Sequence, residues 1–289
     1  MSRVDAHCHF WKLDRGDYNW LDIKNPKLFR IAQDFFPSDL TELREKTGAS
    51  QVVAVQAAAT EAETDFLLKL ADENPEIAGV VGWVDLASSD AENSIEKFST
   101  NSKFKGVRPM LQDIGSTRWL LEVPKYTLWD MMSQKGLRFD ALIKPHHLSV
   151  THEFCLRNSS LPVVIDHAAK PDLASNDKDR MDAWRKGMSG IGRHTHAYCK
   201  ISGLLTELNA EQREDPVTVL QPIVDDLIEW FGPSRLMWGS DWPVLRMASD
   251  YGIWDEITQE LLNKLSLEDR NLILGGTAAS FYGLEAKLA

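Results

Sequence analysis

Short apolar runs alternate with longer amphipathic segments along almost the whole chain. The apolar runs predict eight buried strands over residues 4–9, 51–57, 78–84, 106–110, 138–144, 162–167, 198–203 and 236–241. The segments between and after them have helical patterns over residues 38–47, 61–73, 90–99, 119–135, 148–157, 177–193, 216–231, 251–265 and 267–282. Buried strands that alternate with helices are typical of parallel βαβ units. Eight such units predict an α/β fold, a closed (β/α)8 TIM barrel, and a doubly wound sheet of similar size is the alternative.

Two stretches depart from this alternation and are expected to lie on the rim of the barrel. Residues 10–37 have weak periodicity and many aromatic side chains, so we expect a long ordered loop after the first strand, and such loops are often functional. Residues 172–182 form a polar stretch after the sixth strand. Ser38 is expected to cap the helix that follows the first loop. No linker or repeat divides the sequence, which predicts a single domain over residues 1–289.

Composition and charge limit the class of partner. The chain has 289 residues, of which 43% are hydrophobic and 26% charged, and a barrel of this type needs about 250 residues. The 43 acidic residues outnumber the 32 basic ones, so the net charge is −11. The average surface therefore repels anionic polymers, and nucleic acid is not an expected partner. A small anionic substrate stays open, because a local basic site can outweigh the mean field.

Cysteines and apolar segments indicate the compartment. Cys8, Cys155 and Cys199 are sparse and irregularly spaced, which does not predict a disulfide framework. The first ten residues have no apolar signal core, and no apolar run approaches the roughly 20 residues of a membrane helix. We therefore expect a cytoplasmic protein that does not associate with a membrane.

Polar residues follow nearly every predicted strand. Barrel enzymes place their chemistry at the C-terminal ends of the strands, where buried polar groups can converge. The residues at these ends are His7, His9, Gln56, Asp85, Arg108, Lys144, Asp166, His167, Lys200, Ser202 and Asp241. The regularity of this set is a stronger indication of an active site than any single member.

The first candidate motif is a pair of histidines at the end of the first strand. His7 and His9 are two residues apart, so their side chains share one face of a strand. Two imidazoles on one face can bind a divalent ion or polarise a carbonyl. A pair of surface histidines is the alternative. His194 and His196 have the same spacing but precede the seventh strand, so we expect them at the opposite end of the barrel and outside the catalytic site.

Two further strand ends supply an imidazole and a carboxylate. His167 follows a buried apolar run, and the alternative is a structural histidine. Asp241 lies between Gly239, which permits close backbone approach, and Pro243, which ends the strand. A carboxylate in this position can act as a general base toward water or as a metal ligand. An aspartate that only forms the turn is the alternative.

Cations and aromatic residues near the same ends are candidates for substrate binding. Arg108 and Lys144 end two other strands, and Lys170 lies just beyond His167. They can bind a carboxylate, a hydroxyl or a developing oxyanion, and a structural ion pair is the alternative. Trp11 and Trp242 flank the first and last motifs and are expected to form aromatic walls. His146 and His147 follow Lys144 directly and are weaker candidates.

Together these motifs resemble the amidohydrolase superfamily, in particular its amidohydrolase-related (amidohydrolase 2) branch of sugar-lactone and pyrone-dicarboxylate lactonases. The matching segments are residues 5–11, 105–108, 164–167, 199–204, 237–243 and 275–284. The resemblance covers the chain from Val4 to Leu284 and looks closest to L-fuconolactonase- and L-rhamnonolactonase-type enzymes. It implies a (β/α)8-barrel hydrolase with His7, His9, His167 and Asp241 as its catalytic core.

The resemblance also bears on the cofactor. The chain has Arg108 where binuclear members have a bridging ligand, and its fifth strand ends in Lys144, so a two-metal site is not expected. Some lactonases of this branch work without a metal. The expectation is therefore either no required cofactor or one divalent ion, zinc or manganese, held by His7, His9 and Asp241.

The reaction that the resemblance implies is hydrolysis of an aldonolactone, such as L-fucono- or L-rhamnonolactone, to the aldonic acid in carbohydrate catabolism. Asp241 would act as general base on water, and the histidines would polarise the carbonyl. The alternative is a metal-dependent decarboxylase of an unsaturated or aromatic acid on the same barrel. A ligand-binding barrel is disfavoured, because binding alone does not call for a convergent set of His and Asp. The expected partner is a small sugar lactone, and a homodimer stays open.

Overall fold

The computed structural model, which describes residues 3–22 and 24–285, contains one sheet of eight parallel strands. The strands are β1 (Arg3–Cys8), β2 (Ala49–Val55), β3 (Ile77–Gly82), β4 (Phe104–Val107), β5 (Arg138–Ala141), β6 (Val163–Ile165), β7 (Tyr198–Ile201) and β8 (Leu236–Trp238). Each strand pairs with the next one in the sequence. Beyond the strand ends, the amide of Asp241 donates to the carbonyl oxygen of His7 at 2.8 Å, and the amide of His9 donates to that of Trp242 at 2.7 Å. These bonds link β8 to β1. The predicted barrel is confirmed, and the doubly wound sheet is excluded.

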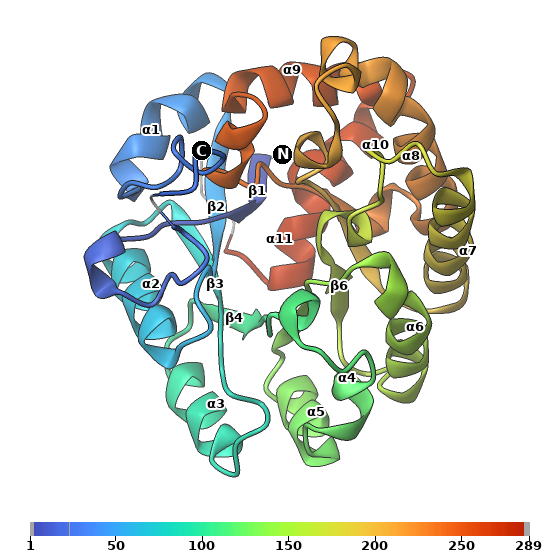
Figure 1. Ribbon diagram of the computed structural model, residues 1–289. Helices are drawn as coiled ribbons and strands as arrows, with labels where there is room; N and C mark the ends of the chain where they lie inside the picture. The colour runs from blue at the N-terminus through green and yellow to red at the C-terminus, as the bar shows by residue number, and fades with distance from the viewer. Residues whose placement is uncertain (1–2, 23, 286–289) are drawn as a thin grey trace.

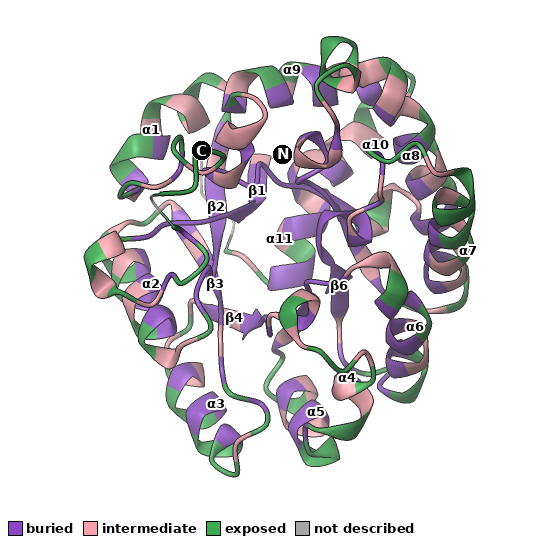
Figure 2. Cartoon of the chain, in the orientation of Figure 1, coloured by how far each residue is buried: buried purple, intermediate pink, exposed green. Residues whose placement is uncertain are grey.

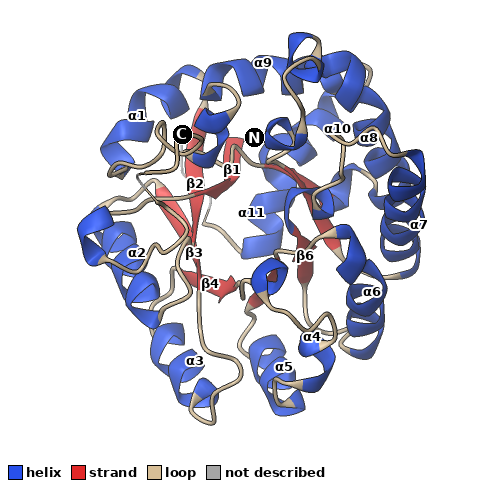
Figure 3. Ribbon diagram, in the orientation of Figure 1, coloured by secondary structure: helices blue, strands red, loops and turns tan. Residues whose placement is uncertain are grey.

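Helices surround the strands on the outside of the barrel (Figures 1 and 3). They are α1 (Pro37–Lys46), α2 (Glu61–Glu73), α3 (Ala91–Ser99), α4 (Trp119–Glu122), α5 (Tyr126–Gln134), α6 (Leu148–Arg157), α7 (Lys178–His194), α8 (Pro216–Phe231), α9 (Tyr251–Leu261) and α10 (Leu267–Asn271). A further helix, α11 (Thr277–Tyr282), lies across the N-terminal end of the barrel instead. Among the described residues, no helix has the length and apolar character needed to cross a bilayer.

Three details of the helix prediction were wrong. The predicted helix over 119–135 is two helices, because Pro124 between them has no amide to continue the ladder. The predicted helix over 267–282 is interrupted by a π-helical segment, Leu272–Gly276, that ends in two glycines. Ser38 is not a cap, because α1 already begins at Pro37. The carboxylate of Asp39 instead accepts a hydrogen bond from the amide of Phe36 at 2.8 Å.

The interior of the barrel is apolar at its N-terminal end and is closed there by α11. Alternate residues of the strands, including Val4, Ala6 and Val53, form a buried cluster with Phe281 and Tyr282 of α11. Figure 1 shows α11 across the middle of the ring of strands, and Figure 2 shows that the strands are buried. Polar groups that point into the barrel can therefore reach solvent only at the opposite, C-terminal end.

The described parts of the predicted loop, residues 10–22 and 24–37, lie on the C-terminal rim. The indole of Trp20 donates to the carbonyl oxygen of Ala57, just beyond β2, at 2.7 Å. The hydroxyl of Tyr18 donates to the buried carboxylate of Glu63 on α2 at 2.6 Å. Trp11 pairs with Phe35 at the two ends of the loop. These contacts fix the loop as one wall of the mouth.

Candidate active site

Three imidazoles and one carboxylate from three strand ends meet at the mouth of the barrel. His7 and His9 lie at the end of β1. His167 is two residues beyond the end of β6, and Asp241 is three residues beyond the end of β8. Oδ1 of Asp241 is 3.2 Å from Nε2 of His9 and 3.8 Å from Nε2 of His7. It is 3.9 Å from Nε2 of His167. The structure thus brings together, in one place, all four residues that the sequence proposed as a catalytic core.

A local irregularity of β1 places both histidines in the site. Val4 and Ala6 face the barrel interior, and simple alternation would direct Cys8 inward and His7 outward. The pairing of β1 with β2 instead shifts its register between Asp5 and Cys8. A shift of this kind re-aims the side chains that follow it. His7 therefore reaches the site although Ala6, its neighbour, also faces the interior.

The backbone at two strand ends is held in an unfavourable conformation. His167, Ala168, Ala169 and Lys170 all have φ between 49° and 58°, and Asp241 has a φ of 58°. A left-handed conformation costs a residue with a Cβ roughly 1–2 kcal/mol. The surrounding structure must therefore impose it, and such strain is concentrated at functional sites.

Two glycines leave room for the imidazoles. A Cβ on Gly203 would lie 2.6 Å from Nδ1 of His167, and one on Gly239 would lie 2.7 Å from Cβ of His7. Gly203 also has a φ of +63°, which disfavours other residues. The close backbone approach predicted for Gly239 is confirmed, since any larger residue would displace His7.

The hydrogen bonds of His9 define its neutral form. Nδ1 of His9 is 2.7 Å from the carbonyl oxygen of Val55, which can only accept. Nδ1 therefore carries a proton, and Nε2 of the neutral ring turns a lone pair toward Oδ1 of Asp241. Two lone pairs that face each other at 3.2 Å require a proton or a cation between them.

The charge states of Asp241 and His167 suit a base and a donor. Burial would raise the pKa of Asp241, but the charges that His167 and His7 carry when protonated outweigh burial and hold the pKa below its usual range. Burial lowers the pKa of His167 to about 4. At neutral pH the site thus holds a carboxylate and a neutral imidazole. Nδ1 of His167 is 2.9 Å from the hydroxyl of Ser202, which can donate to it and leave the proton on Nε2, facing the pocket.

Buried charges lie directly beneath the imidazoles. Nζ of Lys200 is 3.0 Å from Nδ1 of His7, 2.6 Å from Oδ2 of Asp140 and 3.0 Å from Oδ1 of Asp166. Nη1 of Arg108 is 3.4 Å from Nε2 of His7 and 3.4 Å from Oδ2 of Asp166. Both nitrogens of His7 thus face a cation. Burial and the charge of Lys200 lower the pKa of His7 far below its ordinary value, which keeps the ring neutral.

A pocket of about 280 Å3 opens above this centre. Its polar lining includes His9, Arg108, Gln112, His167, Lys170 and Asp241. Its apolar lining includes Trp20, Leu28, Met110, Leu142, Val244 and Met247. An apolar cavity with a few convergent polar groups is the usual form of a small-molecule site.

The two tryptophans predicted as walls lie beside this pocket rather than among its lining residues. Trp11 is buried and stacks on His9 with their ring centroids 6.3 Å apart. Trp242 packs edge-on against Phe35 at 5.2 Å. The tryptophan that lines the pocket wall is Trp20, not Trp11 or Trp242 as the sequence predicted. The signal for Trp20 was weak, because no strand motif adjoins it.

The chain matches the amidohydrolase family model over residues 4–284. It belongs to the amidohydrolase family. It is 40% identical to an L-fucono-1,5-lactonase from Burkholderia ambifaria, over 98% of this chain and 96% of that protein. It is 32% identical to an L-fucono-1,5-lactonase from Burkholderia multivorans, over 98% of this chain and 96% of that protein. The predicted family is therefore confirmed.

Solved structures of other amidohydrolases have the same fold. A Burkholderia multivorans amidohydrolase with bound zinc superposes with a TM-score of 0.90 at 32% identity, over 99% of this chain and 100% of that one. A 2,6-dihydroxybenzoate decarboxylase from Rhizobium superposes with a TM-score of 0.66 at 12% identity, over 98% of this chain and 99% of that one. The decarboxylase shares the barrel alone, so the similarity gives no support to the alternative reaction.

The donor atoms of this amidohydrolase can accommodate a divalent ion. One ligand atom from each of His7, His9 and Asp241 lies within 4.8 Å of the others. Nε2 of His9 and Oδ1 of Asp241 face each other with lone pairs, and a cation could bind both atoms. A second group, formed by His7, Asp166 and His167, shares His7 with the first. In the tautomer of His7 that carries its proton on Nδ1, 3.4 Å from Oδ1 of Asp166, Nε2 keeps a lone pair for an ion and Nδ1 has none. The donor set therefore fits one ion.

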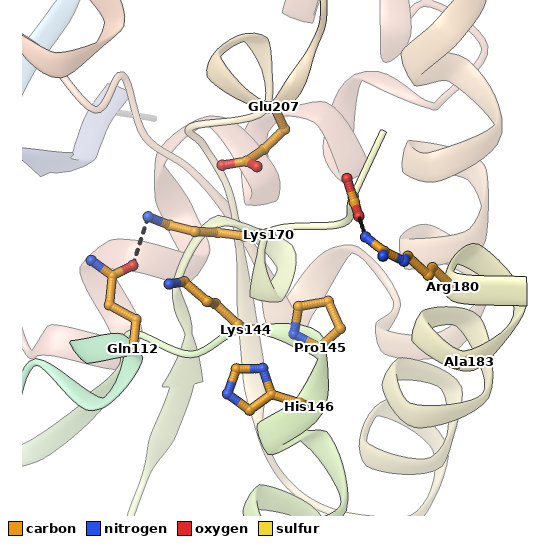
Figure 4. Close-up of a pocket in the computed structure, with 9 residues that line it drawn as sticks. Gln112, Lys144, Pro145, His146, Lys170, Arg180, Ala183 and Glu207 are labelled. Atoms are coloured by element: carbon orange, nitrogen blue, oxygen red, sulfur yellow. Dashed lines mark hydrogen bonds and ion pairs between the residues drawn. The ribbon is translucent and has the colours of Figure 1, made fainter. Parts of the chain in front are cut away.

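Lys144 and Lys170 lie along a second, larger cavity of about 790 Å3 on the same face of this amidohydrolase. Lys170 and Gln112 line both cavities, so the two adjoin. Lys144 lines the second cavity and is not among the residues that line the first. Figure 4 shows the two lysines extending toward Gln112, with Glu207 on the other side of the opening.

Other residues singled out in the sequence lie away from the reaction pocket. Asp85 is exposed, although it follows a strand. His194 and His196 are exposed and precede β7, which confirms their predicted place at the N-terminal end. His146 lines the second cavity, and His147 is buried.

Several polar residues of the site had not been singled out, among them Asp140, Gln112 and Glu207. Asp140 is in the middle of β5, and Gln112 and Glu207 lie in short 3-10 helices after β4 and β7. None of them ends a predicted strand. For the two helical residues, the loop position after a strand was the only signal that could have found them.

Proposed function

We propose that this amidohydrolase hydrolyses the ester bond of a sugar lactone, with L-fucono-1,5-lactone and related aldonolactones as its substrates. The observation that carries the proposal is the carboxylate of Asp241 within 3.9 Å of three imidazoles, at the base of a pocket of about 280 Å3. Two relatives named L-fucono-1,5-lactonase support the substrate class.

Asp241 is the general base of the proposed reaction. It takes a proton from a water molecule, and the oxygen of that water attacks the lactone carbonyl. The tetrahedral intermediate then collapses, and the bond between the carbonyl carbon and the ring oxygen breaks. Asp241 returns the proton to the departing ring oxygen. The single product is the ring-opened aldonic acid, which carries a free hydroxyl at the former ring oxygen and whose carboxyl group ionises at neutral pH.

Neighbouring donors stabilise the oxyanion. His167 and Arg108 both border the pocket. Nε2 of His167 is 3.9 Å from Oδ1 of Asp241, and Nη1 of Arg108 is 3.4 Å from Nε2 of His7. Donors held in place before the reaction stabilise developing charge without reorganisation. Arg108 is held by Asp166 and by the carbonyl oxygen of Gln56. Lys170 is placed to bind substrate hydroxyls, since it borders the same pocket.

We further propose zinc or manganese as the ion that His7, His9 and Asp241 would hold. When bound, the ion would polarise the lactone carbonyl or an adjacent water. An ester carbonyl is more electrophilic than that of an amide, and Arg108 already provides a cation at the site. The chain's own residues therefore suffice for the steps described above.

The experiment follows lactone hydrolysis with a pH indicator, over a panel of aldonolactones of different configuration and ring size. We expect turnover of L-fucono-1,5-lactone by the native protein. We expect Asp241→Asn to lower kcat by about 10²–10⁴-fold, the usual contribution of a general base.

The matched control is Asp85→Asn, because Asp85 also follows a strand but is exposed. This variant should keep native turnover. Full activity in Asp241→Asn would remove the base and the proposed mechanism with it. No turnover of any lactone in the panel by the native protein would overturn the proposed function.

A further inference from the structure

The second cavity lies at the C-terminal face of the barrel, over strands β4 to β7. Its lining includes Gln112 after β4, Lys144 after β5, Lys170 after β6 and Glu207 after β7. Its outer wall is formed by α7, through Arg180. At about 790 Å3 it is much larger than the adjoining reaction pocket of about 280 Å3. The mechanism above makes no use of this space.

Two lysines at its inner end have no carboxylate of the described residues within ion-pair distance, although the charge of Glu207 acts on both of them. Lys170 donates to the side-chain oxygen of Gln112 at 2.8 Å, and within the described part of the chain neither Lys144 nor Lys170 forms an ion pair. By contrast, Arg180 at the outer wall is paired with Asp172 at 2.6 Å. Figure 4 shows both ammonium groups extending to the same side of the cavity. In a chain of net charge −11, two unpaired cations at one place indicate a site for an anionic group.

Hydrolysis of a lactone changes the charge of the bound molecule. The substrate is neutral, and the aldonate product carries a carboxylate at the carbon that was attacked. That carboxylate forms beside Asp241, whose side chain is almost fully buried. Two like charges in a site of low dielectric repel each other strongly. The product carboxylate is therefore repelled from Asp241, and Lys170 provides a cation at the border of the two cavities.

We propose that the second cavity is a carboxylate site, in which Lys144 and Lys170 receive the newly formed carboxylate of the aldonate as it leaves Asp241. This inference rests on the proposed lactonase function. Lys170 borders both cavities and makes the first contact, and Lys144 lies further along the path. The same cations would bind a carboxylate that a lactone substrate carries outside its ring, so the two sources need separate arms of the test.

Glu207 competes with the product for these lysines. Its carboxylate points into the opening across from Lys170 (Figure 4). Burial raises its pKa, which the charges of Lys170 and Lys144 partly offset. Because Glu207 and the product carry the same charge, Glu207 weakens aldonate binding and so favours release. Removal of this charge should therefore have the opposite effect to removal of a lysine.

The test measures the binding of L-fuconate by titration calorimetry, with the corresponding alditol as a neutral ligand of similar size. Lys144→Met should weaken L-fuconate binding about three- to tenfold, and Glu207→Gln should tighten it by a similar factor, the range of a partly exposed charge pair. Neither variant should change alditol binding. The control is Lys69→Met on α2, which removes the same charge from an exposed position remote from the cavity and should leave both affinities unchanged.

A second arm identifies the source of the carboxylate by comparing hydrolysis of an aldonolactone with that of an aldaric acid monolactone of the same configuration. Similar kcat/KM values support the product as the ligand, whereas a strong preference for the aldaric lactone that Lys144→Met abolishes would assign the site to a substrate carboxylate and overturn the proposal. Unchanged L-fuconate affinity in both Lys144→Met and Glu207→Gln would also overturn it. Calorimetry needs no turnover, so its result is independent of the test of Asp241.

Discussion

At the scale of single residues, the protonation of His9 determines what the site can bind. The carbonyl oxygen of Val55 fixes the proton of His9 on Nδ1. Nε2 then faces Asp241 with a lone pair, and His7 provides a third donor atom nearby. Nη1 of Arg108 is 3.4 Å from Nε2 of His7, so this cation competes with a metal ion for that nitrogen. The residues thus permit one ion, and Arg108 can stabilise an oxyanion without it.

The first prediction at this scale concerns metal removal. After dialysis against a chelator, we expect the metal-free protein to retain measurable lactone hydrolysis, because Arg108 and His167 still stabilise the oxyanion. Added zinc should raise the melting temperature of the native protein but not that of Asp241→Asn, which lacks one ligand. Elemental analysis and an indicator assay on the same samples provide the measurement. Complete loss of activity that one equivalent of zinc restores would instead show that the ion is essential.

At the scale of elements, the loop after β1, described over residues 10–22 and 24–37, contributes Trp20 and Leu28 to the wall of the reaction pocket and is anchored by a buried glutamate. Glu63, in the first turn of α2, accepts hydrogen bonds from the hydroxyl of Tyr18 at 2.6 Å and from the amide of Ala57 at 3.0 Å. Nη2 of Arg15, in the same loop, is 3.4 Å from Oε2 of Glu63. The position of Trp20 at the pocket therefore depends on a group whose charge is costly to bury.

This burial predicts a dependence of stability on pH. Burial raises the pKa of Glu63 from 4.5 to about 7 in the folded protein. Between these values the folded state binds more protons than the unfolded state, so the contribution of Glu63 to stability decreases as pH rises through this window and stays lowered above it. Glu63→Gln stays neutral and avoids this cost. Its free energy of unfolding, relative to the native protein, should therefore increase by about 1–3 kcal/mol between about pH 5 and about pH 8.

The native protein and Glu63→Gln are both unfolded with urea at the two pH values. The difference between their free energies of unfolding is then compared between the two pH values, so the contributions of other titrating groups cancel. Glu73→Gln, an exposed substitution on the same helix, is the matched control and should show no such change. A difference for Glu63→Gln that is the same at both pH values would mean that Arg15 keeps Glu63 ionised throughout.

At the scale of the whole molecule, the C-terminal helix connects the closed end of the barrel to the charges beneath the site. The hydroxyl of Tyr282 donates to Oδ2 of Asp140 at 2.7 Å, across 142 residues of sequence. The same oxygen accepts from Lys200, whose Nζ also lies 3.0 Å from Nδ1 of His7. The closing helix therefore contributes to the site without contact to substrate. A cytoplasmic location and a homodimer stay predictions.

The prediction at this scale is a loss of global stability in Tyr282→Phe. The substitution keeps the ring but removes one of the two donors to Asp140, whose other oxygen has no partner among the described residues. Loss of a hydrogen bond to a buried charge costs about 1–3 kcal/mol. The fall should appear in the free energy of unfolding measured with urea. Tyr126→Phe, at an exposed position on α5, should stay within about 0.5 kcal/mol of the native protein.

The sequence by itself determined the barrel and the four residues at its centre. Alternation of apolar runs with helices has few architectural solutions, and the C-terminal ends of parallel strands must converge. His7, His9, His167 and Asp241 could therefore be placed together before any coordinates. The helix bounds were less secure, because capping at Pro37 and the break at Pro124 depend on local backbone geometry.

Only the tertiary structure decided which face of β1 carries the histidines, which aromatic residue lines the pocket, and which charges lie beneath it. The register shift after Asp5 arises from pairing with β2, and Trp20 reaches the pocket through contacts with distant segments. Asp140 and Glu207 do not end any predicted strand. The physical reason is that side-chain direction and burial depend on neighbours that are remote in sequence, whereas strand and helix periodicity is local.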